Sequence, residues 1–112
     1  MSLTITAPDI ERQNELENDD SHEPQYDVVL LDDDDHTYDY VIEMLQRIFI
    51  HSLEQALHNA QEVDATGRTV VITCDLPQAE FGRDQIHAYG RDWRLTRSKG
   101  SMSAVVEPST AA

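Results

Sequence analysis

The sequence has few basic residues: eight lysines and arginines stand against 22 aspartates and glutamates, giving a formal net charge of −14 over 112 residues. Proteins that bind nucleic acid neutralise phosphates with lysine and arginine, so this balance argues against a nucleic-acid partner. Five of the eight basic residues fall in one stretch, from Arg83 to Lys99. We expect that stretch to be a solvated helix and loop.

Cysteine and long apolar runs are also scarce. The single cysteine, Cys74, excludes an intrachain disulfide and a cysteine-based metal cluster. No apolar run approaches the roughly 20 residues that a membrane-spanning helix needs. The first residues, MSLTITAPDIE, lack the basic start and the apolar stretch of a secretory signal. We therefore expect a soluble cytoplasmic protein without membrane contact, metal or cofactor.

Composition divides the chain into three segments. Residues 1–25 hold few large apolar residues after Ile10 and include the acidic stretch ERQNELENDDSHEP, which predicts a disordered acidic extension. Residues 26–107 carry the apolar patterns and suffice for one small core. Residues 108–112 are predicted to be a disordered tail. We expect the chain to be a monomer.

The apolar periodicity of residues 26–107 predicts the order β-α-α-β-α-β. The β-branched runs YDVVLL, RTVVITC and MSAVVE are typical of strands. Apolar steps of three and four residues predict helices after Thr37, after Ser52 with its capping box SLEQ, and after Asp75. The third helix is expected to extend far enough to pack Trp93 in the core. The fold is therefore α+β, with a small three-stranded antiparallel sheet covered on one face by three helices.

Four aspartates, Asp32 to Asp35, stand between the first strand and the first helix. Turns and helix N-termini favour aspartate, which explains one or two of them but not four. A calcium loop of the EF-hand type beginning at Asp32 would place Thr37 where glycine is needed and would use His36, a poor ligand for a hard cation. Catalytic carboxylates need a cleft with contrasting environments, which adjacent solvated aspartates do not supply, so an enzyme is not favoured. Capture of a cation remains: carboxylates held at a turn bind an ammonium group through charge-assisted hydrogen bonds.

The stretch YDVVLLDDDDHTYDYVIEMLQRIF, with the strand GRTVVI after the second helix, resembles ClpS. That family comprises adaptors that carry N-degron substrates to Clp AAA+ unfoldases. Its members show a tyrosine, a strand of the type V-I-L-x-N-D-D, and then T-x-x-x-V-x-x-x-L. The likeness runs from residue 26 to 93 without a gap and needs an insertion near residues 94–101. The residues in register are Tyr26, Val28, Leu30, Asp33, Asp34, Val41, Ile42, Leu45, Gln46 and Phe49.

The resemblance implies a site for the free α-amine of a substrate. The amine would meet Asp32, Asp33 and Asp64, which stand where the family has an asparagine, an aspartate and a histidine. Tyr38 replaces the methionine that selects among first side chains. Carboxylates around an amine suit a cation, and their repulsion predicts a raised pKa for one of them. The substrate-binding residues implied are Asp32, Asp33, Asp34, His36, Tyr38, Val41, Ala60, Asp64 and Met102.

The resemblance also implies partners. It predicts an adaptor, not an enzyme, that binds the N-terminal segments of substrate proteins and delivers them to a Clp AAA+ unfoldase for degradation. Glu80 is the implied unfoldase contact, whereas Pro77 and Gly82 stand where the family often has an acid and a lysine. The alternative is a ClpS-like interaction module without N-degron binding, since one fold can serve several functions.

Overall fold

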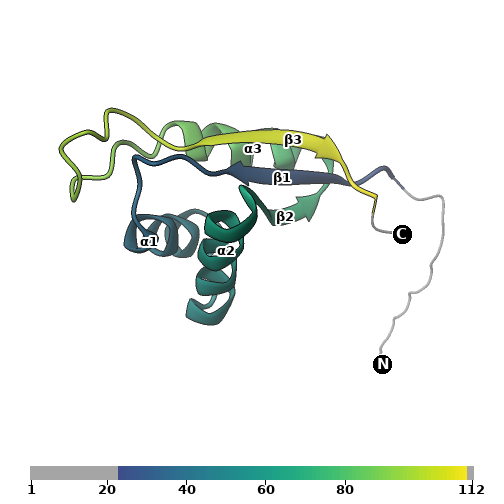
Figure 1. Cartoon of the computed structure of the whole chain (residues 1–112). Helices are drawn as coiled ribbons and strands as arrows, with labels where there is room; N and C mark the ends of the chain where they lie inside the picture. The colour runs from purple at the N-terminus through teal and green to yellow at the C-terminus, as the bar shows by residue number, and fades with distance from the viewer. Residues whose placement is uncertain (1–22, 111–112) are drawn as a thin grey trace, which may run out of the picture.

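A computed structural model of the chain describes residues 23–110 (Figure 1). Its elements are β1 (Tyr26–Leu31), α1 (Tyr38–Ile48), α2 (Leu53–Thr66), β2 (Arg68–Cys74), α3 (Leu76–His87) and β3 (Ser103–Pro108). The predicted order and the three-stranded antiparallel sheet are confirmed. Within the described range, no helix combines the length and apolar character needed to cross a bilayer.

The first described strand, β1, is the central strand of the sheet, which has the order β2-β1-β3. In Figure 1, α3 lies behind the sheet, whereas α1 and α2 lie below it. Val28 and Leu30 of β1 are fully buried in the core formed with the helices. Val29 points to the other face, because side chains alternate along a strand, and it pairs there with Val70 of β2 and Val105 of β3. The sheet therefore has one face in the core and one face that is partly exposed, where Val29 is buried between the exposed Val70 and Val105.

The helices begin where the sequence predicts. Thr37, Ser52 and Asp75 have extended backbones, and their side chains accept hydrogen bonds from the N–H three residues further on. The donor–acceptor distances are 3.1, 3.1 and 2.9 Å. Such caps satisfy one of the backbone donors that a helix leaves unpaired at its start. Local chemistry therefore fixes the starting points of all three described helices.

The prediction that Trp93 packs in the core is wrong. Helix α3 ends at His87, and Gly90 then takes a left-handed backbone with φ +108°, so Trp93 lies on the loop of residues 88–102. Its side chain is 70% exposed, and the guanidinium of Arg94 lies 4.6 Å from the ring centroid. The apolar residues keep their helical spacing beyond His87, where α3 ends, so the spacing alone does not indicate the end of the helix.

The ordered sheet extends slightly into both predicted flanking segments. Pro108 is the last residue of β3 and pairs with Tyr26 of β1. The N–H of Ser109 donates to the carbonyl of Gln25 at 2.9 Å. The rest of the predicted extension, residues 1–22, and the last two residues lie outside the described part of the chain.

Gly82 marks a close approach between α3 and the end of α1. A Cβ atom at this position would lie 3.0 Å from Cε1 and 3.3 Å from Cζ of Phe49. We expect Gly82→Val to lower the free energy of unfolding by about 1–3 kcal/mol, because the Phe49 ring must move to admit the new side chain. Urea denaturation measures this loss. Gln78→Val, at an exposed position of the same helix, controls for the cost of a β-branched residue in a helix. Equal losses in the two variants would contradict the packing argument.

Candidate functional site

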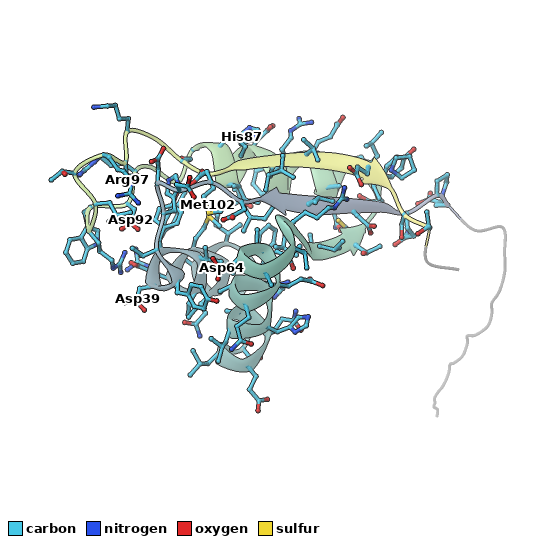
Figure 2. All side chains as sticks on the ribbon, in the orientation of Figure 1. Asp39, Asp64, His87, Asp92, Arg97 and Met102 are labelled. Carbon is cyan, nitrogen blue, oxygen red and sulfur yellow. The ribbon has the colours of Figure 1, made fainter. Side chains whose placement is uncertain are left out.

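A pocket of about 290 Å³ opens where the end of β1, the start of α1, the end of α2 and the loop of residues 88–102 meet. Its floor is apolar, and each floor residue is at most 4% exposed: Val41, Ala60, Val63 and Met102. Its rim carries four carboxylates: Asp32, Asp33, Asp34 and Asp64. Figure 2 shows Asp64 on α2, with Arg97 and Met102 on the segment that leads into β3. The pocket thus combines an apolar floor with a strongly negative rim.

All nine residues that the resemblance implied line this one pocket, although they come from four parts of the chain: Asp32, Asp33, Asp34, His36, Tyr38, Val41, Ala60, Asp64 and Met102. Glu80 lies elsewhere, exposed on α3. The pocket also contains Thr37, Val63 and Arg97, which the sequence analysis did not select. Val63 follows Ala60 by about one helical turn, a spacing that could have identified it. Arg97 falls in the predicted insertion, where no family position indicates a role.

Asp33 is held firmly on one side. Its Oδ1 accepts the N–H of Asp35 at 2.9 Å and lies 2.7 Å from Nδ1 of His36. The Nε2 of His36 lies 2.7 Å from the carbonyl oxygen of Gly100, and the His36 side chain is only 3% exposed. Within residues 23–110, Oδ2 of Asp33 forms no hydrogen bond, so this oxygen is available to a ligand.

His36 connects the aspartate turn to the loop of residues 88–102. Both of its ring nitrogens face acceptors, the carboxylate of Asp33 and the carbonyl of Gly100. One ring nitrogen therefore lies against the aspartate turn and the other against the loop, and the ring fixes the direction of the Asp33 carboxylate.

Asp32 and Asp64 add negative charge to the same rim. Burial raises the pKa of Asp32 above its ordinary value, and the charges of Asp64, Asp33 and Asp34 raise it further. The direction agrees with the pKa expected from repulsion, although burial is the larger cause. Oδ2 of Asp64 accepts a hydrogen bond from the Tyr38 hydroxyl at 3.1 Å, which raises the pKa of that hydroxyl. The Tyr38–Asp64 pair therefore joins α1 to α2 beside the pocket.

A buried carboxylate, Asp92, fixes the loop of residues 88–102. Asp92 is fully buried, and its Oδ2 accepts the backbone N–H and the hydroxyl of Thr37, both at 2.7 Å. Its Oδ1 accepts the backbone N–H of Arg94 at 3.0 Å and the guanidinium of Arg94 at 3.2 Å. Burial alone would raise the pKa of Asp92, but these donors hold it at about 2. Asp92 thereby ties one wall of the pocket to the first turn of α1.

The described residues contain no group of three or more histidine, cysteine, aspartate or glutamate side chains placed to hold a metal ion. The rim aspartates, three adjacent in sequence and Asp64 on α2, do not form such a group. The chemistry that the rim offers is hydrogen bonding and charge pairing with a cationic group.

Comparison with known proteins places these observations in a family. The family model described as ATP-dependent Clp protease adaptor protein ClpS matches residues 21–94. Two curated relatives named ATP-dependent Clp protease adapter protein ClpS, from Synechococcus sp. and Synechococcus elongatus, are each 35% identical over 68 residues. The match covers 60% of this chain and 75% and 72% of those relatives.

A solved structure shares the fold. It is the structure of Agrobacterium tumefaciens ClpS2 bound to L-phenylalaninamide, with a TM-score of 0.67 and 22% sequence identity. The superposition covers 79% of this chain and 100% of that chain. Arg97 and Met102 lie beyond the residues that the family model matches, so the wall they form is not part of that match.

Proposed function

Because this chain belongs to the ClpS family of ATP-dependent Clp protease adaptors, we propose that it binds the free N-terminus of substrate proteins and delivers them, in the cytoplasm, to a Clp AAA+ unfoldase. The observation that carries the proposal is the pocket, in which a carboxylate rim stands over an apolar floor. An N-terminal residue has the complementary chemistry, an ammonium group attached to a side chain. The ammonium group binds the rim and the first side chain enters the pocket.

Asp33 is the central ligand of the ammonium group in this proposal. Its Oδ1 is occupied by protein donors, which leaves Oδ2 for the amine. Charge-assisted hydrogen bonds of this kind are about twice as strong as neutral ones. A bound cation also relieves the repulsion that contributes to the raised pKa of Asp32. The negative rim is therefore stabilised by the ligand that it binds.

Tyr38 sets the preference for the first side chain in this proposal. Its ring lines the pocket and its hydroxyl is tied to Asp64, which restricts its movement. We expect Tyr38→Met to improve the binding of peptides with bulky aromatic first residues, relative to small ones, by about fivefold, because methionine is flexible and adapts to its neighbours. Fluorescence anisotropy of both peptide types measures the ratio. Tyr38→Phe removes only the hydroxyl and serves as the control. An unchanged ratio in Tyr38→Met would contradict this role.

Delivery requires a second surface, which we assign to α3. Glu80 is exposed on this helix, away from the pocket, so a substrate and an unfoldase can bind at the same time. Phe81, next to it in the chain, is 65% exposed. Large exposed aromatic side chains are frequent anchors of protein interfaces. Glu80 and Phe81 therefore offer charge and apolar area at one place.

The test of the proposed function is a peptide panel. Peptides labelled at the C-terminus and differing in the first residue are titrated with the protein, each beside an N-acetylated partner, and fluorescence anisotropy is measured. We expect some free-amine peptides to bind and their acetylated partners to fail. If none binds, the alternative of a ClpS-like interaction module without N-degron binding takes its place.

A further inference from the structure

Among the described residues that line the pocket, Arg97 is the only arginine or lysine. It stands on the loop of residues 88–102, beyond the residues that the family model matches, and its side chain is 62% exposed. Carboxylates attract an ammonium group, whereas a guanidinium repels it. Binding of an ammonium group alone therefore does not account for Arg97. The hydrogen bonds of its guanidinium indicate which ligand group it can bind.

The guanidinium of Arg97 is oriented by the aspartate turn. Its Nε and Nη2 both donate to the carbonyl oxygen of Asp34, and Nε lies 3.3 Å from Oδ1 of Asp35. A guanidinium carries five N–H donors, two of them on Nη1. Within the described residues, Nη1 of Arg97 makes no hydrogen bond. Three donors therefore remain on an oriented group at the pocket, two on Nη1 and the second N–H of Nη2.

The loop that carries Arg97 is anchored at several points. Asp92 binds Thr37, and Gly100 lies within hydrogen-bond distance of His36. The buried hydroxyl of Ser98, next to Arg97, accepts the N–H of Asp92 at 2.9 Å. A ligand group that meets Arg97 therefore does not have to order the loop, which keeps the entropy cost of binding low.

We propose that Arg97 binds a carboxylate lying close to the ligand's ammonium group, an inference that rests on the proposed function. A guanidinium matches a carboxylate in shape as well as in charge. Two ligands present this arrangement: a substrate with aspartate or glutamate as its second residue, and a free amino acid with its α-carboxylate. The rim aspartates repel such a carboxylate, and Arg97 offsets that repulsion. The pocket thus accepts N-termini that are followed by an acidic residue.

The first experiment compares two free-amine peptides that differ only in glutamate or glutamine at the second position. Their affinities for the wild-type protein and for Arg97→Gln are measured by fluorescence anisotropy. We expect Arg97→Gln to weaken the glutamate peptide about three- to tenfold more than the glutamine peptide. If Arg97 only supports the loop, both peptides weaken equally, and the proposal is overturned.

Two further variants test whether the effect requires the guanidinium of Arg97 or only a positive charge. Lys99→Gln removes one positive charge from an exposed position of the same loop that does not line the pocket. It should leave the ratio of the two affinities unchanged, and a shift equal to that of Arg97→Gln would overturn the proposal. Arg97→Lys retains the charge without the planar fork, so we expect it to restore part of the preference.

A competition arm distinguishes the two carboxylate sources. Free phenylalanine and phenylalaninamide are used to displace a labelled peptide from the wild-type protein and from Arg97→Gln. If Arg97 binds the α-carboxylate, free phenylalanine displaces the labelled peptide better than phenylalaninamide does from the wild-type protein, but not from Arg97→Gln. If Arg97 binds an acidic second residue, Arg97→Gln changes the relative affinities of the glutamate and glutamine peptides, but not the competition by phenylalanine and phenylalaninamide. A wild-type protein that binds no peptide overturns both proposals, whereas amine-dependent binding with no response to Arg97→Gln in either arm overturns this one alone.

Discussion

Asp33→Asn is expected to weaken the binding of free-amine peptides by about thirtyfold or more, since removing one partner of a hydrogen-bonded charge pair costs roughly 2 kcal/mol or more. The substitution keeps the shape of the side chain, and its remaining oxygen still accepts the N–H of Asp35. The new NH2 group faces the pocket and repels the ammonium group. An anisotropy titration with a binding peptide measures the loss.

Asp39→Asn is the matched control for this result. Asp39 is exposed in the first turn of α1, and it does not line the pocket, yet the change removes the same charge. Its effect on affinity should stay below about twofold, as expected for a screened surface charge. Wild-type affinity in Asp33→Asn would remove Asp33 from the amine site. Joint replacement of Asp33, Asp34 and Asp64 by alanine separates the two candidate functions, since an interaction module without N-degron binding would keep its partner.

Asp92→Asn is expected to lower the free energy of unfolding by about 2–4 kcal/mol, a range typical of breaking a buried charged hydrogen-bond network. Both carboxylate oxygens of Asp92 accept two hydrogen bonds each. An amide keeps only one acceptor oxygen, so the donors of either Thr37 or Arg94 lose their partner. Urea denaturation measures the change. Asp84→Asn, at an exposed position of α3, should be nearly neutral, and similar losses in both variants would exclude a special role for Asp92.

The contribution of Asp92 is also expected to depend on pH. Its pKa is lowered from an ordinary 3.8 to about 2 in the folded protein, so the unfolded chain takes up the proton first as the pH falls. The stabilisation is therefore fully present above about pH 4 and is lost as the pH falls through 2. The shift corresponds to roughly 2 kcal/mol. The difference in stability between the wild type and Asp92→Asn should narrow in this window, and a constant difference would contradict the argument.

The sequence predicts those parts of the fold that depend on neighbouring residues. Thr37, Ser52 and Asp75 cap their helices through bonds that span three residues, so the pattern alone reveals them. Trp93 shows where this reasoning fails. Its spacing continues the apolar face of α3, but the backbone of Gly90 and the bonds from Thr37 to Asp92, across 55 positions of the chain, direct the loop elsewhere. No local pattern encodes a contact of that length.

The candidate site also has one part that the sequence predicts and one part that it does not. The resemblance to a family transfers a known topology, and this is why the nine residues drawn from it meet at one pocket. The pairing of Tyr38 with Asp64 and of Asp33 with His36 depends on side-chain directions that no alignment supplies. Arg97 had no family position at all, and its place in the wall follows from the anchored loop. The contacts of residues that depart from the family pattern could therefore be found only from the structure.

The central place of β1 in the sheet has a consequence for synthesis. Its first neighbour, β2, follows two helices, and its second neighbour, β3, is the last of the described elements. One edge of β1 therefore stays unpaired until the residues of β3 have left the ribosome. An unpaired strand edge is a template for pairing with another chain, and pairing across a long sequence separation is slow. Nascent chains that stop before Ser103 present this edge permanently, so they are the species most exposed to self-association and to quality-control proteolysis.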